Sequence, residues 1–285
     1  MDPEKRPLLG AHLSIAGGHA LACARAHEAG CNALQIFVKN HRMWRASPLA
    51  PADADLFRRA REAAGVKSAF AHATYLLNLA SPDPGLWAKS LDGFVDELAR
   101  CDALGLDALV VHPGAAGPPG KEAAAAALAK ALDQAVARTA GSRVRILLET
   151  AAGQGGALGS SFGELRSVVD RLGDASRIGF CLDTCHVFAA GYDLSTREGY
   201  DRTFEAFDRE LGLRRLEAFH LNDSKKGLGS RVDRHEHIGK GAIGPGAFER
   251  LMRDRRFRDI PKVIETPKVG DMDRVNLDLL RRMAG

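Results

Sequence analysis

The sequence lacks the features of a secreted or membrane-bound protein. Only five of its 285 residues are cysteines, an odd number whose spacing forms no disulfide framework. No run approaches the ~18 apolar residues needed to cross a membrane, and no signal peptide precedes the first predicted strand. We therefore expect a cytoplasmic protein without a membrane partner, whose cysteines are packed structural thiols.

Two kinds of motif are also missing. Cys181 and Cys185 flank Asp183 without the Cys-x-x-Cys spacing that is typical of thiolate metal sites. The glycines within residues 153–156 are followed by Leu158, where a dinucleotide-binding fingerprint requires its third glycine. These absences argue against a thiolate metal site and against a dinucleotide-binding site.

The composition is that of an ordinary globular protein, with 45% apolar and 27% charged residues. The formal net charge of +4 permits a polyanionic partner without requiring one, since a solvated Lys and Arg surface gives the same balance. No linker, low-complexity tract or break in composition divides the chain. We therefore expect residues 1–285 to form a single domain.

What the sequence does contain is a repeated unit, in which a short apolar strand is followed by a helix. Strands are predicted over residues 8–13, 32–38, 68–71, 108–111, 144–148, 178–182, 216–219 and 262–264. Helices are predicted over residues 19–29, 52–64, 86–104, 121–139, 162–172, 197–211, 247–256 and 275–283. Apolar strands that alternate with helices are typical of a parallel sheet. Eight such units predict an α/β fold, a closed (β/α)8 or TIM barrel, rather than an open sheet.

The third to the eighth predicted strands each end on a side chain that can bind a metal. These residues are His72, His112, Glu149, Asp183, His220 and Glu265. The C-terminal ends of the strands form one mouth of a TIM barrel, so these side chains are expected to converge there. His186 follows Asp183 by three positions, and in an extended segment Asp233 and His235 point the same way.

Each of these residues also has an ordinary structural alternative. A single His at a strand end often only hydrogen-bonds in the core, and Asp183 or Glu149 can cap the helix that follows. The whole set argues for a metal, because unpaired carboxylates and imidazoles gathered in one pocket are costly without a cation. Mixed His and carboxylate ligands suit zinc, manganese or iron in a catalytic site. Nine candidates are too many for one ion, and clusters of two or three ions typically hydrolyse phosphate esters.

Several longer strings carry a family resemblance. They are CLDTCHVFAAGYDL at 181–194, HLNDSK at 220–225, DRHEHIGKG at 233–241, HATYLLNL at 72–79 and VHPG at 111–114. In these strings, and in their order over about residues 10–267, the chain resembles the endonuclease IV family, the apurinic/apyrimidinic (AP) endonucleases of DNA repair. The resemblance implies a TIM barrel with three Zn²⁺ ions that acts on damaged double-stranded DNA as a monomer, with no obligate protein partner.

The resemblance also implies which residue binds which ion. It gives three ligand sets: His72, His112 and Glu149; Glu149 again with Asp183, His220 and Glu265; and His186 with Asp233 and His235. Glu149 thus bridges two ions. Spacing alone leaves His237 open beside His235, and His12, at the end of the first strand, has at most a supporting role. Manganese is an alternative to zinc at some positions.

The implied reaction is hydrolysis of the phosphodiester 5′ to an abasic sugar, by in-line attack of a hydroxide generated at zinc. It leaves a 3′-hydroxyl and a 5′-deoxyribose phosphate, and the family also implies trimming of 3′ ends. Three Zn²⁺ carry six positive charges against four carboxylates, which leaves about two positive charges for an anionic substrate. Glu149 is the implied catalytic residue, since the bridging ligand also positions the nucleophile.

Substrate selection is expected to come from two loops. The resemblance matches Tyr75 and Leu76 to one insertion loop and Arg42 and Met43 to the other. These four residues are expected to bind DNA and to fill the gap left when the abasic nucleotide flips out. Ordinary loop packing is the alternative for all four, and Trp44 is expected to belong to the core.

Two other functions remain open on the residues alone. A sugar isomerase or epimerase shares the barrel and a metal–carboxylate–His site, but it needs only one or two ions, so His186, Asp233 and His235 would be surplus. A non-catalytic protein that binds damaged DNA would use structural zinc, but structural sites are closed and usually rich in Cys. All the candidate ligands here are His, Asp or Glu.

Overall fold

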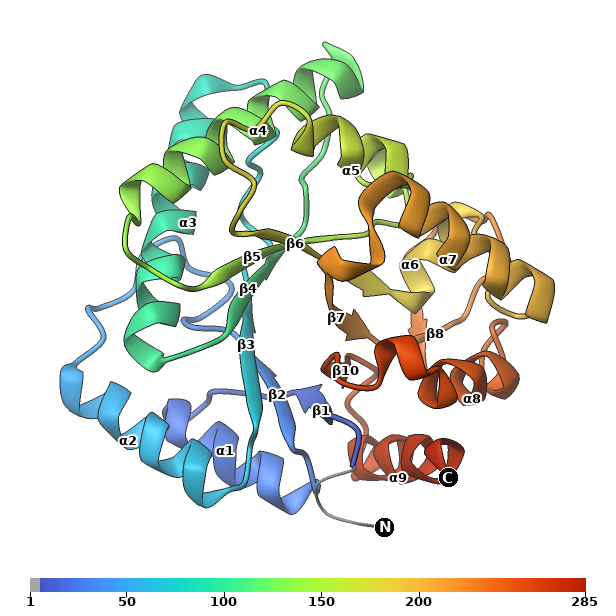
Figure 1. The fold of residues 1–285 in the computed structure, drawn as a ribbon. Helices are drawn as coiled ribbons and strands as arrows, with labels where there is room; N and C mark the ends of the chain where they lie inside the picture. The colour runs from blue at the N-terminus through green and yellow to red at the C-terminus, as the bar shows by residue number, and fades with distance from the viewer. Residues whose placement is uncertain (1–5) are drawn as a thin grey trace.

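The computed structural model describes residues 6–285 and contains a closed barrel of parallel strands surrounded by helices (Figure 1). The strands follow one another around the barrel in the order β1-β10-β7-β6-β5-β4-β3-β2. Their bounds are β1 Leu9–His12, β2 Ala33–Ile36, β3 Ser68–His72, β4 Ala108–Val111, β5 Arg145–Glu149, β6 Ile178–Asp183, β7 Leu216–His220 and β10 Lys262–Ile264. The predicted (β/α)8 barrel is confirmed.

The helices are α1 His19–Glu28, α2 Pro51–Ala63, α3 Pro84–Leu104, α4 Gly120–Arg138, α5 Phe162–Val169, α6 Thr184–Ala190, α7 Arg197–Leu211, α8 Pro245–Arg253 and α9 Met272–Ala284. Helix α3 begins before the predicted residue 86, because Asp83 accepts a hydrogen bond from the Leu86 amide and Pro84 suits the first helical position. Helix α8 ends earlier than predicted, and a separate 3₁₀ turn follows at Arg255–Phe257.

Helix α6 was not predicted. It has seven residues, and all but Ala190 are buried, so its sequence shows no polar face and reads as a continuation of the apolar strand before it. The long segment after β7 also contains an unpredicted pair of short strands, β8 Asp223–Ser224 and β9 His235–Glu236, which pair antiparallel. This pairing folds the segment back onto itself, so that His235 lies opposite Ser224.

One layer of side chains fills the barrel interior. It contains small or apolar residues from seven strands: Ala33, Phe70, Val110, Leu147, Cys181, Ala218 and Val263. In β1 the corresponding inward position is Gly10, where a Cβ would lie 1.7 Å from the Ala33 carbonyl oxygen. Only glycine therefore lets β1 and β2 approach closely enough to close the barrel. A second, larger cluster of apolar residues lies between the strands and the surrounding helices.

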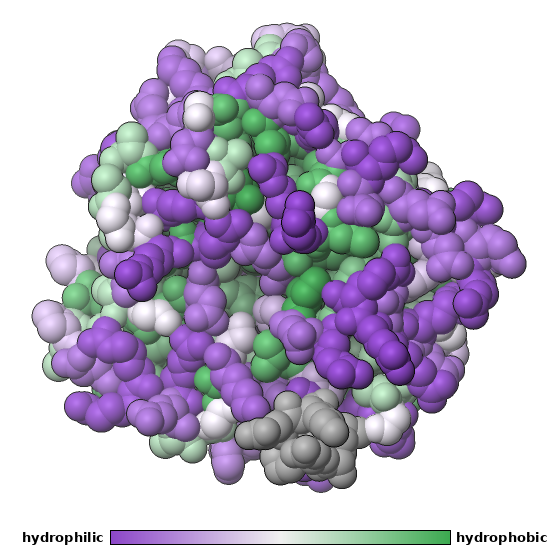
Figure 2. Space-filling model, viewed as in Figure 1, coloured by the Kyte–Doolittle hydropathy of each residue, from purple (hydrophilic) through white to green (hydrophobic). Residues whose placement is uncertain are grey.

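The surface and the cysteines agree with the composition. On the face drawn in Figure 2, hydrophilic residues cover most of the surface, with smaller hydrophobic areas between them. Within residues 6–285, no helix is both long enough and apolar enough to cross a membrane. Cys23, Cys31, Cys101, Cys181 and Cys185 are all buried and unpaired, which confirms that they are packed thiols.

Candidate metal centre

The candidate ligands lie one step above the apolar layer of the barrel. Side chains two positions apart in a strand point to the same side, so the residue that follows each interior residue by two positions faces the barrel mouth. Counted in this way, the eight strands contribute His12, Gln35, His72, His112, Glu149, Asp183, His220 and Glu265. The convergence predicted from the strand ends is therefore present in the structure.

The first group consists of His72, His112 and Glu149, whose ligand atoms lie within 4.8 Å of one another. One carboxylate oxygen of Glu149, Oε2, lies 3.0 Å from His72 Nε2 and 3.5 Å from His112 Nε2. The other ring nitrogen of His72 donates a hydrogen bond of 2.7 Å to the Ala73 carbonyl. This bond leaves Nε2 as the nitrogen that is free to bind a metal.

The second group shares Glu149 with the first and adds Asp183, His220 and Glu265. His220 Nδ1 lies 2.9 Å from Glu149 Oε1, 3.3 Å from Glu265 Oε2 and 3.9 Å from Asp183 Oδ2. The two oxygens of Glu149 thus face different groups. This is the arrangement that a carboxylate bridging two cations requires.

The third group lies beside the second. His186 Nε2 is 3.1 Å from Asp233 Oδ2, and His235 Nε2 is 3.3 Å from Asp233 Oδ1. Asp183 Oδ2 is 3.6 Å from His235 Nε2, so this member of the second group also borders the third. His237, which spacing alone left open, instead has its Nδ1 3.0 Å from the Asn276 amide nitrogen.

Asp183 fills both of the roles considered for it. Its Oδ1 accepts a hydrogen bond of 2.9 Å from the His186 amide and so caps helix α6, while its Oδ2 faces the second and third groups. The cap fixes the direction in which His186 leaves the strand. Helix capping and metal binding are therefore not alternatives here, because each uses a different oxygen.

The hydrogen bonds of the imidazoles test whether these groups suit a cation. His186 Nδ1 lies 2.8 Å from the Thr150 carbonyl and His235 Nδ1 lies 3.2 Å from the Glu265 carbonyl, so both rings use an N–H on backbone oxygen. Their Nε2 atoms then face each other at 3.4 Å. Two imidazole lone pairs at this distance repel unless a proton or a metal cation lies between them, and the donor set therefore fits a metal.

Burial and charge act in opposite directions on Glu149. Its side chain is fully buried, which by itself raises the pKa, but His112, His220 and His186 together lower the pKa well below 4.5. For His186 the signs are reversed, because its charged form is the protonated one. Burial by itself lowers the pKa of His186, but the charge of Asp183 and hydrogen bonds to Asp233 and Glu149 raise it well above 6.5. Without a cation, protons on the imidazoles must balance the carboxylates.

Cys185 is an alternative neighbour of the third group, since its sulfur lies within reach of Asp233 and His235. Burial raises the pKa of the Cys185 thiol to about 12. A neutral thiol is a poor metal ligand, because the thiolate is the form that binds. The imidazole of His186 reaches the same carboxylate, with its Nε2 3.1 Å from Asp233 Oδ2.

Sequence reasoning missed the residues that hold the ligands in place. Gln35 is fully buried, and its Oε1 accepts from His220 Nε2 at 2.8 Å while its Nε2 donates to Glu265 Oε1 at 2.6 Å. Asn222 donates to Asp183 Oδ2 at 2.7 Å and accepts from the Glu265 amide at 2.8 Å. Two features of the sequence could have indicated these residues. Gln35 is a polar residue inside the apolar run of β2, and Asn222 lies two residues after the candidate ligand His220.

His12 has the supporting position expected of it. Its Nδ1 lies 2.8 Å from Gln35 Nε2 and 3.1 Å from Glu265 Oε1, at the edge of the second group. Burial lowers its pKa, which favours the neutral ring. His12 thus packs beside the ligands without belonging to any of the three groups.

The four residues expected to bind DNA lie on two loops at the mouth. Tyr75 is 61% exposed and Met43 52% exposed, Arg42 is also exposed, and Leu76 is half-buried. The Tyr75 ring lies 5.4 Å from the His72 ring and 5.9 Å from the His112 ring, measured between centroids. Trp44 is half-buried and packs against the core, as expected.

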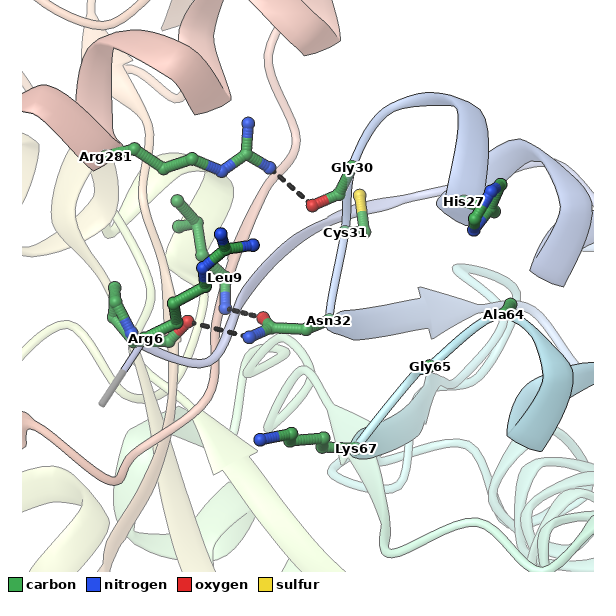
Figure 3. Close-up of a pocket in the computed structure, with 11 residues that line it drawn as sticks. Arg6, Leu9, His27, Gly30, Cys31, Asn32, Ala64, Gly65, Lys67 and Arg281 are labelled. Atoms are coloured by element: carbon green, nitrogen blue, oxygen red, sulfur yellow. Dashed lines mark hydrogen bonds between the residues drawn. The ribbon is translucent and has the colours of Figure 1, made fainter. Parts of the chain in front are cut away.

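Two cavities differ in their relation to these groups. One of about 380 Å³ is lined by residues 73–78, by His112 and by the segments after β4 and β5, and so borders the first group. A larger cavity of about 630 Å³ lies at the opposite end of the barrel, where Arg6, Lys67 and Arg281 extend around it (Figure 3). Active sites of TIM barrels lie at the C-terminal ends of the strands, so the smaller cavity is the functional candidate.

Comparison with known proteins assigns the family. A family model described as a xylose isomerase-like TIM barrel matches residues 23–283. A probable endonuclease 4 of Chloroflexus aurantiacus is 49% identical over 279 residues, covering 97% of this chain and 98% of its own. A probable endonuclease 4 of Trichlorobacter lovleyi is 48% identical, covering 96% of this chain and 99% of its own. The chain belongs to the endonuclease IV family.

Solved structures agree with this assignment. Endonuclease IV from Thermus thermophilus matches with a TM-score of 0.86 and 41% identity, covering 97% of this chain and 98% of that one. A D-tagatose 3-epimerase-like protein matches with a TM-score of 0.76 at 18% identity, covering 96% of both chains. At that identity the epimerase likeness shows only that the two proteins share the barrel fold.

The hydrogen bonds of Gln35 lead to a prediction about metal retention. Gln35→Leu removes the partners of His220 Nε2 and Glu265 Oε1 while keeping the side-chain volume, and loss of such a supporting residue typically weakens metal affinity about 10- to 100-fold. We expect less metal per chain after dialysis against a chelator, measured by elemental analysis. Asn32→Leu is the matched control, because this amide bonds Leu9 and Pro7 at the opposite end of the barrel. Equal retention in both variants would contradict the assigned role.

The raised pKa of His186 predicts an unusual pH dependence for metal-free protein. The pKa of His186 in the folded protein is above 6.5, its value in the unfolded chain, so protonation of His186 stabilises the fold fully below pH 6.5. This stabilisation is lost as the pH rises through the pKa of the folded protein. The free energy of unfolding of metal-stripped protein should therefore fall as the pH rises above 6.5, whereas metal binding, which needs neutral imidazole, strengthens in the same direction. Urea unfolding with and without metal measures both slopes, and a flat profile for stripped protein would contradict the prediction.

Proposed function

We propose that this protein is a metal-dependent DNA-repair endonuclease that hydrolyses the phosphodiester 5′ to abasic sites in duplex DNA. The products are a 3′-hydroxyl and a 5′-deoxyribose phosphate, and blocked 3′ ends are trimmed at the same site. The observation that carries the proposal is the arrangement of the three ligand groups at the barrel mouth. Glu149 belongs to the first two groups, and Asp183 of the second lies within 4.8 Å of the ligand atoms of His186 and His235, which both contact Asp233. Membership of the endonuclease IV family supports it.

The proposed ligands are those of the three groups. His72, His112 and Glu149 would hold one zinc; Glu149, Asp183, His220 and Glu265 would hold a second; and His186, Asp233 and His235 would hold a third. Manganese is an alternative at some positions. When bound, the cations supply the positive charge that neutralises the phosphate and its leaving group, and they lower the pKa of water.

The chain itself contributes orientation and exclusion of solvent. Glu149 is fully buried between four imidazoles, so it positions the groups on either side of it and is the proposed catalytic residue. Asp233 is the most open of the carboxylates, with 43% of its side chain exposed. It lines a further cavity of about 310 Å³ at the barrel mouth, together with His112 and His186. A phosphate entering from solvent reaches the third group there.

The proposed wedge into DNA consists of Arg42, Met43, Tyr75 and Leu76. An exposed aromatic ring and an exposed thioether side chain can fill the space left by an extruded nucleotide, and a site without a base is the least costly to extrude. The Tyr75 ring also lies next to His72 and His112, so the inserted side chain and the first ligand group are adjacent. Binding of the abasic site would thus place its phosphate at the metal groups. The protein is proposed to act on DNA as a monomer.

A sugar isomerase is the second candidate, because epimerases share the barrel. That chemistry leaves the group of His186, Asp233 and His235 without a role. Non-catalytic binding of damaged DNA is disfavoured because the ligand groups open onto a cavity, whereas structural zinc sites are closed.

The direct test is a nicking assay combined with metal analysis. Purified protein should cut a duplex containing a tetrahydrofuran abasic-site analogue immediately 5′ to the lesion, leaving a 3′-hydroxyl that a polymerase extends. Removal of the metals should abolish cutting, and zinc should restore it. Elemental analysis should give about three ions per chain. Intact substrate at high concentration of metal-loaded enzyme would refute the nuclease assignment, and about one ion per chain would favour the isomerase.

The wedge is tested by Tyr75→Ala. Loss of a stacking aromatic is worth about 1–3 kcal/mol, so binding of the abasic duplex should weaken roughly 5- to 150-fold while the zinc content stays the same. Leu56→Ala is the matched control, since Leu56 is 51% exposed on the outer helix α2. Fluorescence anisotropy measures binding, and a loss of zinc in Tyr75→Ala would show that the ring instead supports the ligand His72.

A further inference from the structure

A buried ion pair lies beneath both loops of the proposed wedge. Glu97 in helix α3 is fully buried, and Lys39, which follows β2, is 3% exposed. The Lys39 ammonium lies 3.2 Å from Glu97 Oε1 and 3.1 Å from Asp96 Oδ2. Burying two charges is costly, and such a pair often adds little to stability compared with apolar residues. Its position therefore calls for an explanation other than stability.

Lys39 fixes the loop that follows β2. Its ammonium donates a hydrogen bond of 3.2 Å to the Trp44 carbonyl, so it closes a short loop whose tip is formed by residues 40–43. Within this tip, Asn40 accepts hydrogen bonds from the Arg42 and Met43 amides through its side chain and its carbonyl, respectively. Arg42 and Met43 are thus held between the two ends that Lys39 joins.

Glu97 fixes the loop that follows β3. Its Oε2 accepts a hydrogen bond of 3.0 Å from the Thr74 amide, directly before Tyr75 and Leu76. One carboxylate therefore hydrogen-bonds the Thr74 backbone with one oxygen, while its other oxygen faces the Lys39 ammonium. Glu97 is 23 positions from Thr74 and 58 positions from Lys39 in the sequence. The link between the two loops therefore comes from helix α3 and not from residues of either loop.

Neighbouring residues of α3 extend this support. Arg100 lies 2.9 Å from Asp96 Oδ2, the oxygen that also faces Lys39, and it donates hydrogen bonds to the Ala46 and Ser47 carbonyls. Lys89 lies over the Trp44 ring at 4.1 Å from its centroid. A single face of α3 thus contacts the loop after β2 at several points and the loop after β3 at Thr74.

We propose that Glu97 and Lys39 are positioning residues that set the two wedge loops in one fixed arrangement, so that Met43 and Tyr75 enter abasic DNA together. The proposal rests on the proposed function for its substrate, an abasic duplex. The ion pair touches none of the ligand groups, so its role is in substrate binding rather than in the hydrolytic step. A wedge built from two separate loops needs such a link, because insertion requires both side chains at the same gap.

The test compares Glu97→Gln, Lys39→Met and the double variant with Asp92→Asn. Glutamine keeps an oxygen for the Thr74 amide but loses the charge that holds Lys39, and Lys39→Met removes the contacts to Trp44 and Asp96. Asp92 is the matched control, since it pairs with Arg138 at 2.8 Å on a solvent-exposed part of the same helix. All four proteins are prepared as metal-loaded full chains, with metal content and melting temperature recorded.

We expect KM for the abasic duplex to rise about tenfold in each single variant, with kcat and metal content unchanged. The double variant should regain thermal stability, because no unpaired charge remains buried, but it should keep the raised KM. Asp92→Asn should match the parent. An unchanged KM, or a fall in kcat that follows the loss of metal, would overturn the proposal.

Hydrogen exchange separates this proposal from the proposed function. In both single variants the amides of residues 40–44 and 74–77 should exchange faster together, while those of the barrel strands do not change. If the parent protein does not cut abasic DNA, the proposed function fails, and exchange still reports whether the pair couples the loops. Faster exchange in only one of the two loops would overturn the coupling.

Discussion

The carboxylate of Glu149 is the group on which the rest of the site depends. It is fully buried, with the imidazoles of His72 and His112 facing one oxygen and those of His186 and His220 facing the other. Taking a carboxylate out of water is tolerated only where positive charge compensates for it. Protons on the imidazoles or metal cations between them supply that charge. The three ligand groups thus form one electrostatic unit rather than three separate sites.

The barrel provides the precision that such a unit needs. Rigid strands place one inward side chain each at the mouth, and the apolar layer beneath them excludes water from below. Gln35 and Asn222 then connect ligands that come from different strands, and backbone carbonyls fix the tautomers of His72, His186 and His235. Hydrogen bonds therefore fix the relative positions of the candidate ligands.

The two parts of the proposed activity are supported by separate structures. The candidate ligands lie at strand ends and on the β8–β9 pair. The proposed wedge lies on two loops that helix α3 contacts through Glu97, which faces Lys39, and through Arg100. The two meet where Tyr75 lies beside His72. Because the two supports are separate, a change in the wedge loops need not disturb the geometry of the candidate ligand groups.

The sequence by itself determined the barrel and most of the candidate site. Apolar strands alternating with helices have few stable arrangements. The strand ends and the residue types found there were enough to predict His72, His112, Glu149, Asp183, His220 and Glu265 as candidate ligands. The motif strings of the family added the division into three groups. Local patterns carry this information because strand direction and the two-residue period are fixed by the backbone.

Only the tertiary structure decided which residues meet across the barrel. His235 rather than His237 reaches the third group because β9 pairs with β8, and helix α6 escaped prediction because burial on every side removed its polar face. Gln35 contacts His220, which lies 185 positions away in the sequence, and Glu97 contacts Lys39, which lies 58 positions away. The residues next to Gln35 and Glu97 in the sequence do not indicate these partners. Contacts of this kind depend on the closure of the barrel and on the packing of helices against it, and a pattern of neighbouring residues does not encode them.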